Sequence, residues 1–175
     1  TGFKYGTTVR GIGDTNGDGA DDLIVGSHYW PVGCIAEVDD TSEWDGACSC
    51  SSESGRIFIY NGRSGGLDTD HTSLLGGDAP GDYFSKSIIT DADFNGDGFR
   101  DLLVGIPNDD DGGSNSGALR LYPGSGIGIS TSDVVTIYGS SDGENLGLYT
   151  YRFGAGDLNG DGYDDLVVGI PTDDT

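Results

Sequence analysis

An acidic, glycine-rich motif of thirteen residues occurs three times in this 175-residue chain and constrains its fold more than any other feature. The motif reads Asp-x-Asn-Gly-Asp-Gly-x-x-Asp-Leu-φ-Val-Gly, where φ is apolar, and it begins at Asp14, Asp93 and Asp157. In each copy a polar loop leads directly into a short apolar run, which is the pattern of a turn followed by a strand. Copies that start 79 and 64 residues apart indicate an array of similar structural units.

Three further kinds of segment recur at nearly the same offset, so that each unit of about 62 to 64 residues contains four strand-like pieces. No segment of ten or more residues shows the apolar periodicity of a helix, and the sequence therefore predicts an all-β chain. The recurring segments outside the motif are 55–62 and 117–124, 73–77 and 136–140, and, more loosely, 4–9, 83–89 and 146–153.

The repeats predict one continuous array over residues 1–175 rather than several unrelated domains. The approximate units are 1–80, 81–144 and an incomplete third unit, 145–175. The first unit carries 17 surplus residues after its apolar run, which we interpret as an insertion over residues 28–54, in a loop between two strands.

Each acidic loop places oxygen-bearing groups at alternating positions, as a site for a hard cation requires. Ca²⁺ accepts roughly six to eight oxygen ligands at about 2.3–2.6 Å in flexible geometry. Positions one, three, five and nine offer side-chain oxygens, position seven offers a backbone carbonyl, and the glycine at position six permits the sharp turn. The expected ligands of three calcium sites are Asp14, Asn16, Asp18, Ala20 and Asp22; Asp93, Asn95, Asp97, Phe99 and Asp101; and Asp157, Asn159, Asp161, Tyr163 and Asp165.

The motif differs from an EF-hand, which needs a Glu at position twelve and a helix on each side. Position twelve is here a valine inside the apolar run (Val25, Val104 or Val168), so the loop joins two strands of a hairpin. A plain hairpin turn would explain one Asn-Gly-Asp-Gly segment, but three copies that keep every acidic position favour metal binding. We expect the metal to be structural, since the sequence shows no open coordination position and no nearby general base.

With these motifs the chain resembles the FG-GAP repeat of integrin α-subunit β-propellers. That repeat runs from aromatic-Gly through an acidic loop and Leu-φ-Val-Gly-φ-Pro to Gly-φ-φ-φ-φ-Tyr-x-Gly. The resemblance covers nearly the whole chain except about 28–54, and it implies four-stranded antiparallel blades, Ca²⁺ in one hairpin of each blade and an extracellular setting. Besides the three loops, the matching segments are Tyr5-Gly6, 55–62, 104–107, 117–124 and 168–171.

The chain departs from the family pattern at three places that concern blade packing rather than the metal ligands. Phe84-Ser85 and Leu148-Tyr149 stand where aromatic-Gly is expected, and Ser27-His28 follows the first apolar run in place of φ-Pro. We predict two blades and part of a third, which do not close within this chain, since propellers typically close with about four to eight blades.

Unclosed blades leave three interpretations: a fragment of a longer propeller, copies joined head to tail into a fibre or ring, or an open, self-capped array. The preferred function is an extracellular calcium-binding segment with a structural or adhesion role, whose partner is a protein or glycan ligand. One alternative is the protomer of an extracellular filament or surface assembly, whose partners are further copies of itself. Another is a non-catalytic repeat module of a secreted enzyme.

The charge of the chain narrows the choice of partners. Thirty acidic residues oppose eight Lys and Arg, which gives a formal net charge of −22 at pH 7. Nucleic-acid binding needs a basic face, and membrane insertion needs an apolar run near 18 residues; the sequence offers neither. We expect bound calcium to offset part of the self-repulsion of so acidic a chain.

The insertion contains all three cysteines, Cys34, Cys48 and Cys50. In a secreted protein they predict a disulfide, Cys34 with Cys48 or with Cys50, and the third cysteine can pair between chains. A zinc site that adds His28 is disfavoured because the spacing fits no common finger. We predict no enzyme activity: histidines are scarce, no Gly-x-Ser-x-Gly segment occurs, and the aspartates that keep register are assigned to metal. The acidic run 109–111 is expected to be a solvated turn.

Overall fold

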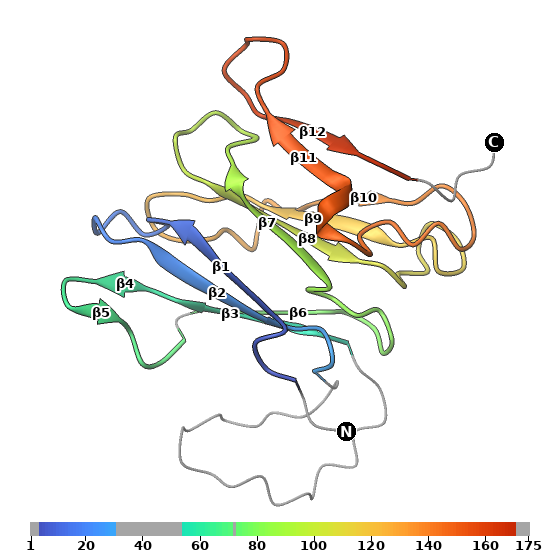
Figure 1. The fold of residues 1–175 in the computed structure, drawn as a ribbon, viewed down its shortest axis with the longest axis horizontal. Helices are drawn as coiled ribbons and strands as arrows, with labels where there is room; N and C mark the ends of the chain where they lie inside the picture. Colours follow the sequence, from blue (N-terminus) through green and yellow to red (C-terminus); the bar gives the residue numbers. More distant parts are fainter. Residues whose placement is uncertain (1–3, 31–53, 72, 171–175) are drawn as a thin grey trace, which may run out of the picture.

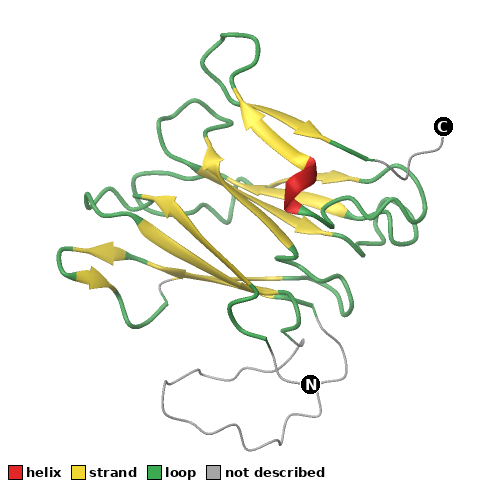
Figure 2. Ribbon diagram, in the orientation of Figure 1, coloured by secondary structure: helices red, strands yellow, loops and turns green. Residues whose placement is uncertain are grey.

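The structure is a computed structural model that describes residues 4–30, 54–71 and 73–170. The described residues form β-strands joined by loops (Figure 2), and helical geometry is confined to one 3₁₀ turn, η1 (Thr150–Arg152). The prediction of an all-β chain is therefore confirmed. The three cysteines and most of the insertion lie outside the described residues.

The first sheet has four antiparallel strands that neighbour one another in chain order, as expected for one blade. A small hairpin of two strands, β4 (Gly62–Arg63) and β5 (Gly66–Leu67), projects between its third and fourth strands. The strands of the sheet are β1 (Thr8–Gly13), β2 (Asp22–Ser27), β3 (Arg56–Tyr60) and β6 (Ser73–Gly76).

The second sheet repeats this topology, and the third contains a single hairpin, so the sheets do not close into a ring within the chain. Two four-stranded sheets followed by a two-stranded one confirm the predicted blades of FG-GAP type. The division of the chain into units at 80 and 144 stays a prediction. The strands are β7 (Ser87–Ala92), β8 (Asp101–Ile106), β9 (Ala118–Tyr122) and β10 (Val135–Tyr138), then β11 (Phe153–Gly156) and β12 (Asp165–Val168).

The sheets follow one another as layers and adjoin through their first strands (Figure 1). Strand β7 contacts both β1 and β11. Thr90 on β7 donates its hydroxyl to the carbonyl of Gly11 at 2.8 Å, and Ser87 donates to the carbonyl of Gly147 at 2.6 Å. The first bond joins the first two sheets, and the second joins β7 to the loop that precedes η1. All three acidic loops project from the same end of the strands (Figure 1).

The apolar core fills the spaces between neighbouring sheets. One cluster joins the first and second sheets and includes Ile24, Phe84 and Leu102, whereas another joins the second and third and includes Leu103. Every residue of β8 is buried because its sheet is covered on both faces. The third sheet packs against the second with one face only, and Val167 on its other face is accordingly 52 % exposed. The outer face of the first sheet instead carries a further buried cluster of Val25, Trp30 and Phe58.

The aromatic-Gly pairs lie where two blades meet. Phe84 is fully buried, and Ser85 after it has a positive φ of 71°, close to the 80° of Gly6. In the third unit the same geometry falls on Leu146-Gly147, where Gly147 has φ 94° and Leu146 is buried. The assignment of Leu148-Tyr149 to this place was therefore wrong, since the interface requires the buried apolar residue rather than an exposed aromatic ring.

Gly117, which begins the segment 117–124, lies against the backbone of Leu146 in the next unit, and a Cβ there would overlap with that backbone. Gly143 has the same φ of 77° but open space around it. We expect Gly117→Ala to lower the free energy of unfolding by about 3 kcal/mol or more, from overpacking as well as left-handed strain. Gly143→Ala, the matched control, adds only the strain, about 1 kcal/mol. Urea unfolding of both variants measures the difference, and equal losses would contradict the interface packing.

Candidate metal sites

The three acidic loops join equivalent pairs of strands: β1 to β2, β7 to β8 and β11 to β12. The structure gives them the same internal hydrogen bonds, copy for copy, although their exposure and neighbours differ. The predicted ligand residues of each copy lie on one loop, so the three loops are three separate candidate sites.

The aspartate at position one organises each loop by accepting backbone hydrogen bonds. Asp14 accepts N–H bonds from Gly17, Asp18 and Gly19 at 2.7, 3.2 and 2.8 Å. Asp93 and Asp157 accept the corresponding bonds in their own loops at 2.7 to 3.2 Å. The chain therefore wraps around this carboxylate, which stays at the loop surface.

Positions three and five each stabilise the backbone two residues ahead. The Asn16 side-chain oxygen accepts the N–H of Asp18 at 3.0 Å, and Asp18 accepts the N–H of Ala20 at 2.9 Å. The same bonds occur in the other loops. Gly17 and Gly19 take positive φ values of 77° and 87°, which this tight winding requires.

Position nine has a structural role that the sequence interpretation missed. Asp22 accepts hydrogen bonds from the N–H and hydroxyl of Thr15 with one oxygen, and from the N–H of Gly62 with the other. Asp101 does the same with the N–H groups of Phe94 and Gly124, both at 2.8 Å. This carboxylate thus ties the acidic loop to the end of the third strand. The last glycines of the segments 55–62 and 117–124, Gly62 and Gly124, donate these bonds and recur at the same place in both units. This recurrence is the sequence feature from which the role of position nine could have been inferred.

The predicted ligand carboxylates of the loops form no ion pair with a basic residue of the described structure. The two ion pairs among the described residues, Arg63–Asp68 and Arg120–Asp78, involve no predicted metal ligand. Backbone hydrogen bonds, led by that of Gly19, lower the pKa of Asp14, and those of Gly162 do the same for Asp157. Burial raises the pKa of Asp101, and the neighbouring Asp93 and Asp97 raise it further.

Within the described part of the chain, no three His, Cys, Asp or Glu side chains are grouped closely enough to hold a metal ion by themselves. The predicted donor set also includes an asparagine oxygen and a backbone carbonyl. A carboxylate offers about four lone-pair sites, so an oxygen that accepts one N–H bond keeps capacity for a cation. The all-oxygen chemistry of the loops fits Ca²⁺ and not zinc.

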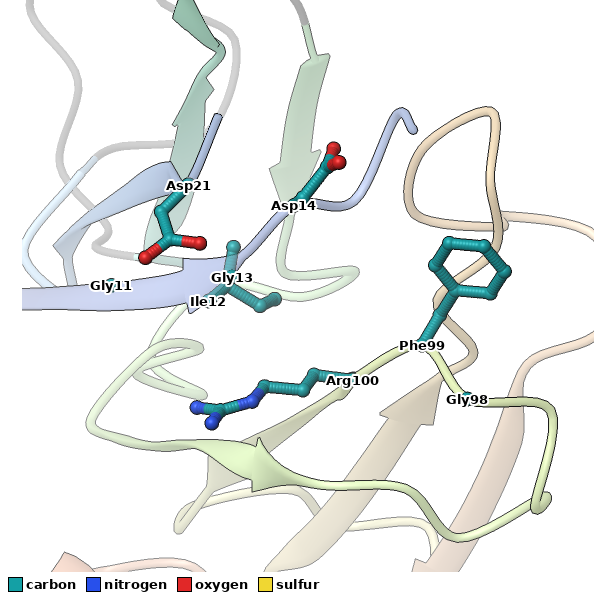
Figure 3. A pocket seen from close by; sticks show the side chains of 8 residues that line it. All are labelled: Gly11, Ile12, Gly13, Asp14, Asp21, Gly98, Phe99 and Arg100. Carbon is teal, nitrogen blue, oxygen red and sulfur yellow. The ribbon is translucent and has the colours of Figure 1, made fainter. Parts of the chain in front are cut away.

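Position eight lies where neighbouring loops meet. Asp164 in the third loop accepts the N–H of Asp93 at 2.8 Å and donates its own N–H to the Asp93 carbonyl at 2.9 Å. In the second loop this position is Arg100, whose side chain extends alongside Gly13 in an open pocket between the first two loops (Figure 3). Arg100 thus places a positive charge between two acidic loops, where it reduces their mutual repulsion.

The acidic run 109–111 lies at the opposite end of the strands and differs partly from its prediction as a solvated turn. Asp110 and Asp111 are exposed, but Asp109 is buried and accepts the N–H of Asp111 at 3.0 Å. Nearby Asp82 is also buried, and burial, together with the charges of Asp109 and other nearby carboxylates, raises its pKa to about 6. Of the disfavoured zinc set, only His28 lies among the described residues.

Comparisons with known proteins agree with the repeat architecture. The family model of the FG-GAP repeat matches residues 87–122 and 149–175. Integrin alpha-7 of Rattus norvegicus is 31 % identical over 99 % of this chain, and integrin alpha-5 of Xenopus laevis is 32 % identical over 95 %. Integrin alpha-4 of Xenopus laevis is 30 % identical over 96 %.

The chain spans only 13 to 14 % of the length of these three relatives. Among the described residues, no helix has the length and apolar character needed to cross a membrane. The matched regions include the second and third acidic loops with their strands, and the relatives align with the first unit as well. The chain therefore contains FG-GAP repeats over the residues that the family model matches, and it is similar, over nearly its whole length, to a segment of integrin alpha subunits.

Proposed function

We propose that this chain is a calcium-binding, integrin-alpha-like β-propeller segment in which each acidic loop holds one structural Ca²⁺. The observation that carries the proposal is the threefold repetition of one loop framework: the same carboxylates accept the same backbone N–H groups in all three copies. Loops of three or four carboxylates without ion-pair partners in the described structure repel themselves, and a divalent cation removes that repulsion.

In this proposal the ligands of each site are those predicted from the motif, including the position-nine carboxylate. When bound, Ca²⁺ supplies positive charge and cross-links the two ends of the loop. The chain itself holds the loop in shape through the position-one carboxylate and joins it to the third strand through Asp22 or Asp101. The metal role is structural.

Calorimetric titration with Ca²⁺ tests the proposal directly. We expect three ions per chain, with dissociation constants near 10⁻⁴–10⁻³ M, which is the range of extracellular modules. Asp14→Asn removes one ligand charge and is expected to abolish or strongly weaken one site. Asp21→Asn, the matched control, removes an adjacent exposed charge that is not a ligand and is expected to keep all three. Absence of calcium binding, or equal loss in both variants, would overturn the assignment.

The proposed role is adhesion-type binding in an extracellular setting, without catalysis. The adhesion-type role is supported by the similarity to integrin alpha subunits over nearly the whole chain. The absence of catalysis is proposed because the metal is assigned a structural role. A protein or glycan ligand is the expected partner. The alternatives, a protomer that joins copies head to tail and a repeat module of a secreted enzyme, stay untested predictions.

A further inference from the structure

The only two lysines in this strongly acidic chain meet at one place, although 82 residues separate them in the sequence. The ammonium group of Lys4 lies 4.0 Å from the centre of the Tyr29 ring, and that of Lys86 lies 5.8 Å from the same centre. Lys4 precedes β1, Tyr29 follows β2 and Lys86 precedes β7, so the cluster lies at the end of the strands opposite the acidic loops (Figure 1).

A chain of hydrogen bonds positions Lys86. Its ammonium group donates to Nε2 of His28 at 3.3 Å, and Nδ1 of His28 lies 3.1 Å from the hydroxyl of Thr7, which donates to the Gly26 carbonyl. Burial, together with the charges of Lys86 and Lys4, lowers the pKa of His28 to about 4, so the ring is neutral at pH 7. The neutral ring accepts from Lys86 at one nitrogen and donates to Thr7 at the other.

Neither lysine forms an ion pair with an acidic residue of the described structure; the ion pairs there involve arginines. Lys86 is half-buried beside His28, which is 9 % exposed, whereas Lys4 is exposed, so one ammonium group is partly shielded from water and the other is accessible to a ligand. Two like charges held near one ring, with no acidic ion-pair partner among the described residues, favour an anion.

We propose that Lys4, Lys86 and the ring of Tyr29 form a binding site for carboxylate side chains of an acidic protein partner. The site deepens the proposed function, on which it rests, by assigning a face and a chemical class of partner. The Tyr29 ring already has an ammonium group over it, so it is not free to stack on a sugar, which disfavours a glycan. Lysines act as point charges that suit single carboxylates, whereas bidentate recognition needs arginine.

The test is an NMR titration of the ¹⁵N-labelled chain, in excess calcium and at constant ionic strength, with an acetylated and amidated Asp–Asp dipeptide. The neutral Asn–Asn dipeptide serves as the isosteric control. We expect the acidic dipeptide alone to shift the backbone amides of Thr7, Tyr29 and Lys86. The double variant Lys4→Gln/Lys86→Gln is expected to bind about tenfold more weakly or worse, since a charged hydrogen bond is lost at each lysine.

Two further variants keep the result interpretable. Arg10→Gln/Arg63→Gln removes the same charge elsewhere and is expected to bind with full affinity, and Lys4→Arg/Lys86→Arg, which keeps the charge, is expected to retain most of the binding. Equal shifts with both dipeptides, unchanged affinity of the glutamine variant, or binding of a sulfated disaccharide but no dipeptide would each overturn the proposal. Calcium titration is measured separately, so failure of the loops as metal sites and failure of this anion site give different results.

Discussion

A chelator is expected to lower the melting temperature of this protein by about 10 °C relative to saturating calcium. At calcium concentrations about ten times the dissociation constant, each site adds roughly 1.4 kcal/mol to the free energy of unfolding. Three sites add roughly 4 kcal/mol, and in a chain of this size each kcal/mol shifts the midpoint by about 2–4 °C. Differential scanning calorimetry with calcium and with EDTA measures the shift.

The ionic strength of the chelated sample supplies the control. Added NaCl screens repulsion between exposed carboxylates, such as Asp18 and Asp21, and is expected to restore part of the lost stability. In saturating calcium the same salt is expected to change the midpoint much less. If the melting temperature were identical with and without chelator, calcium would not stabilise this fold.

Replacing the buried aspartate at position nine is expected to destabilise the protein even when no calcium is present. Asp101 is 1 % exposed and accepts the N–H groups of Phe94 and Gly124. Asp101→Ala leaves both donors without their acceptor, at about 1–3 kcal/mol each. Because burial raises the pKa of Asp101, removal of this buried charge offsets part of the loss. We expect the free energy of unfolding to fall by about 3 kcal/mol in EDTA, as measured by urea denaturation.

Asp97→Ala in the same loop is the matched comparison. Asp97 is exposed and accepts the N–H of Phe99 at 2.8 Å within the loop. We expect its replacement to cost stability mainly in calcium, where a metal ligand is lost, and little in EDTA. If Asp101→Ala also acted only in calcium, position nine would be a ligand without the structural role that its hydrogen bonds indicate.

Much of the fold could be predicted from the repeats because each copy contains the residues that determine its own loop and strand. Asn-Gly-Asp-Gly specifies a wound loop through glycines that take positive φ and carboxylates that accept nearby N–H groups. The apolar run after it specifies a strand. These interactions span few residues, so they are visible in the sequence, and all three loops adopt the expected form.

The prediction that Leu148-Tyr149 takes the aromatic-Gly place was wrong because the local sequence pattern does not show which residue packs between the blades. An aromatic residue near the expected place suggested the equivalent of Phe84, but the interface accommodates Leu146, whose backbone lies against Gly117. Similarly, the hydrogen bonds of Asp22 and Asp101 extend to a third strand, 40 and 23 residues along the chain. Pairing at that distance depends on how strands stack and not on the motif.

The sequence by itself determined the repeat, the all-β class and the acidic loops, since each follows from residues close together in the chain. The tertiary structure alone decided the environment of each copy. Leu103 in the middle sheet is 3 % exposed because the third sheet packs over it, whereas its counterpart Val167 in the last described sheet is 52 % exposed because no further described sheet covers that face. It also brought Lys4 and Lys86 around one ring, because stacking of the first two sheets places the start of β7 beside the end of β2.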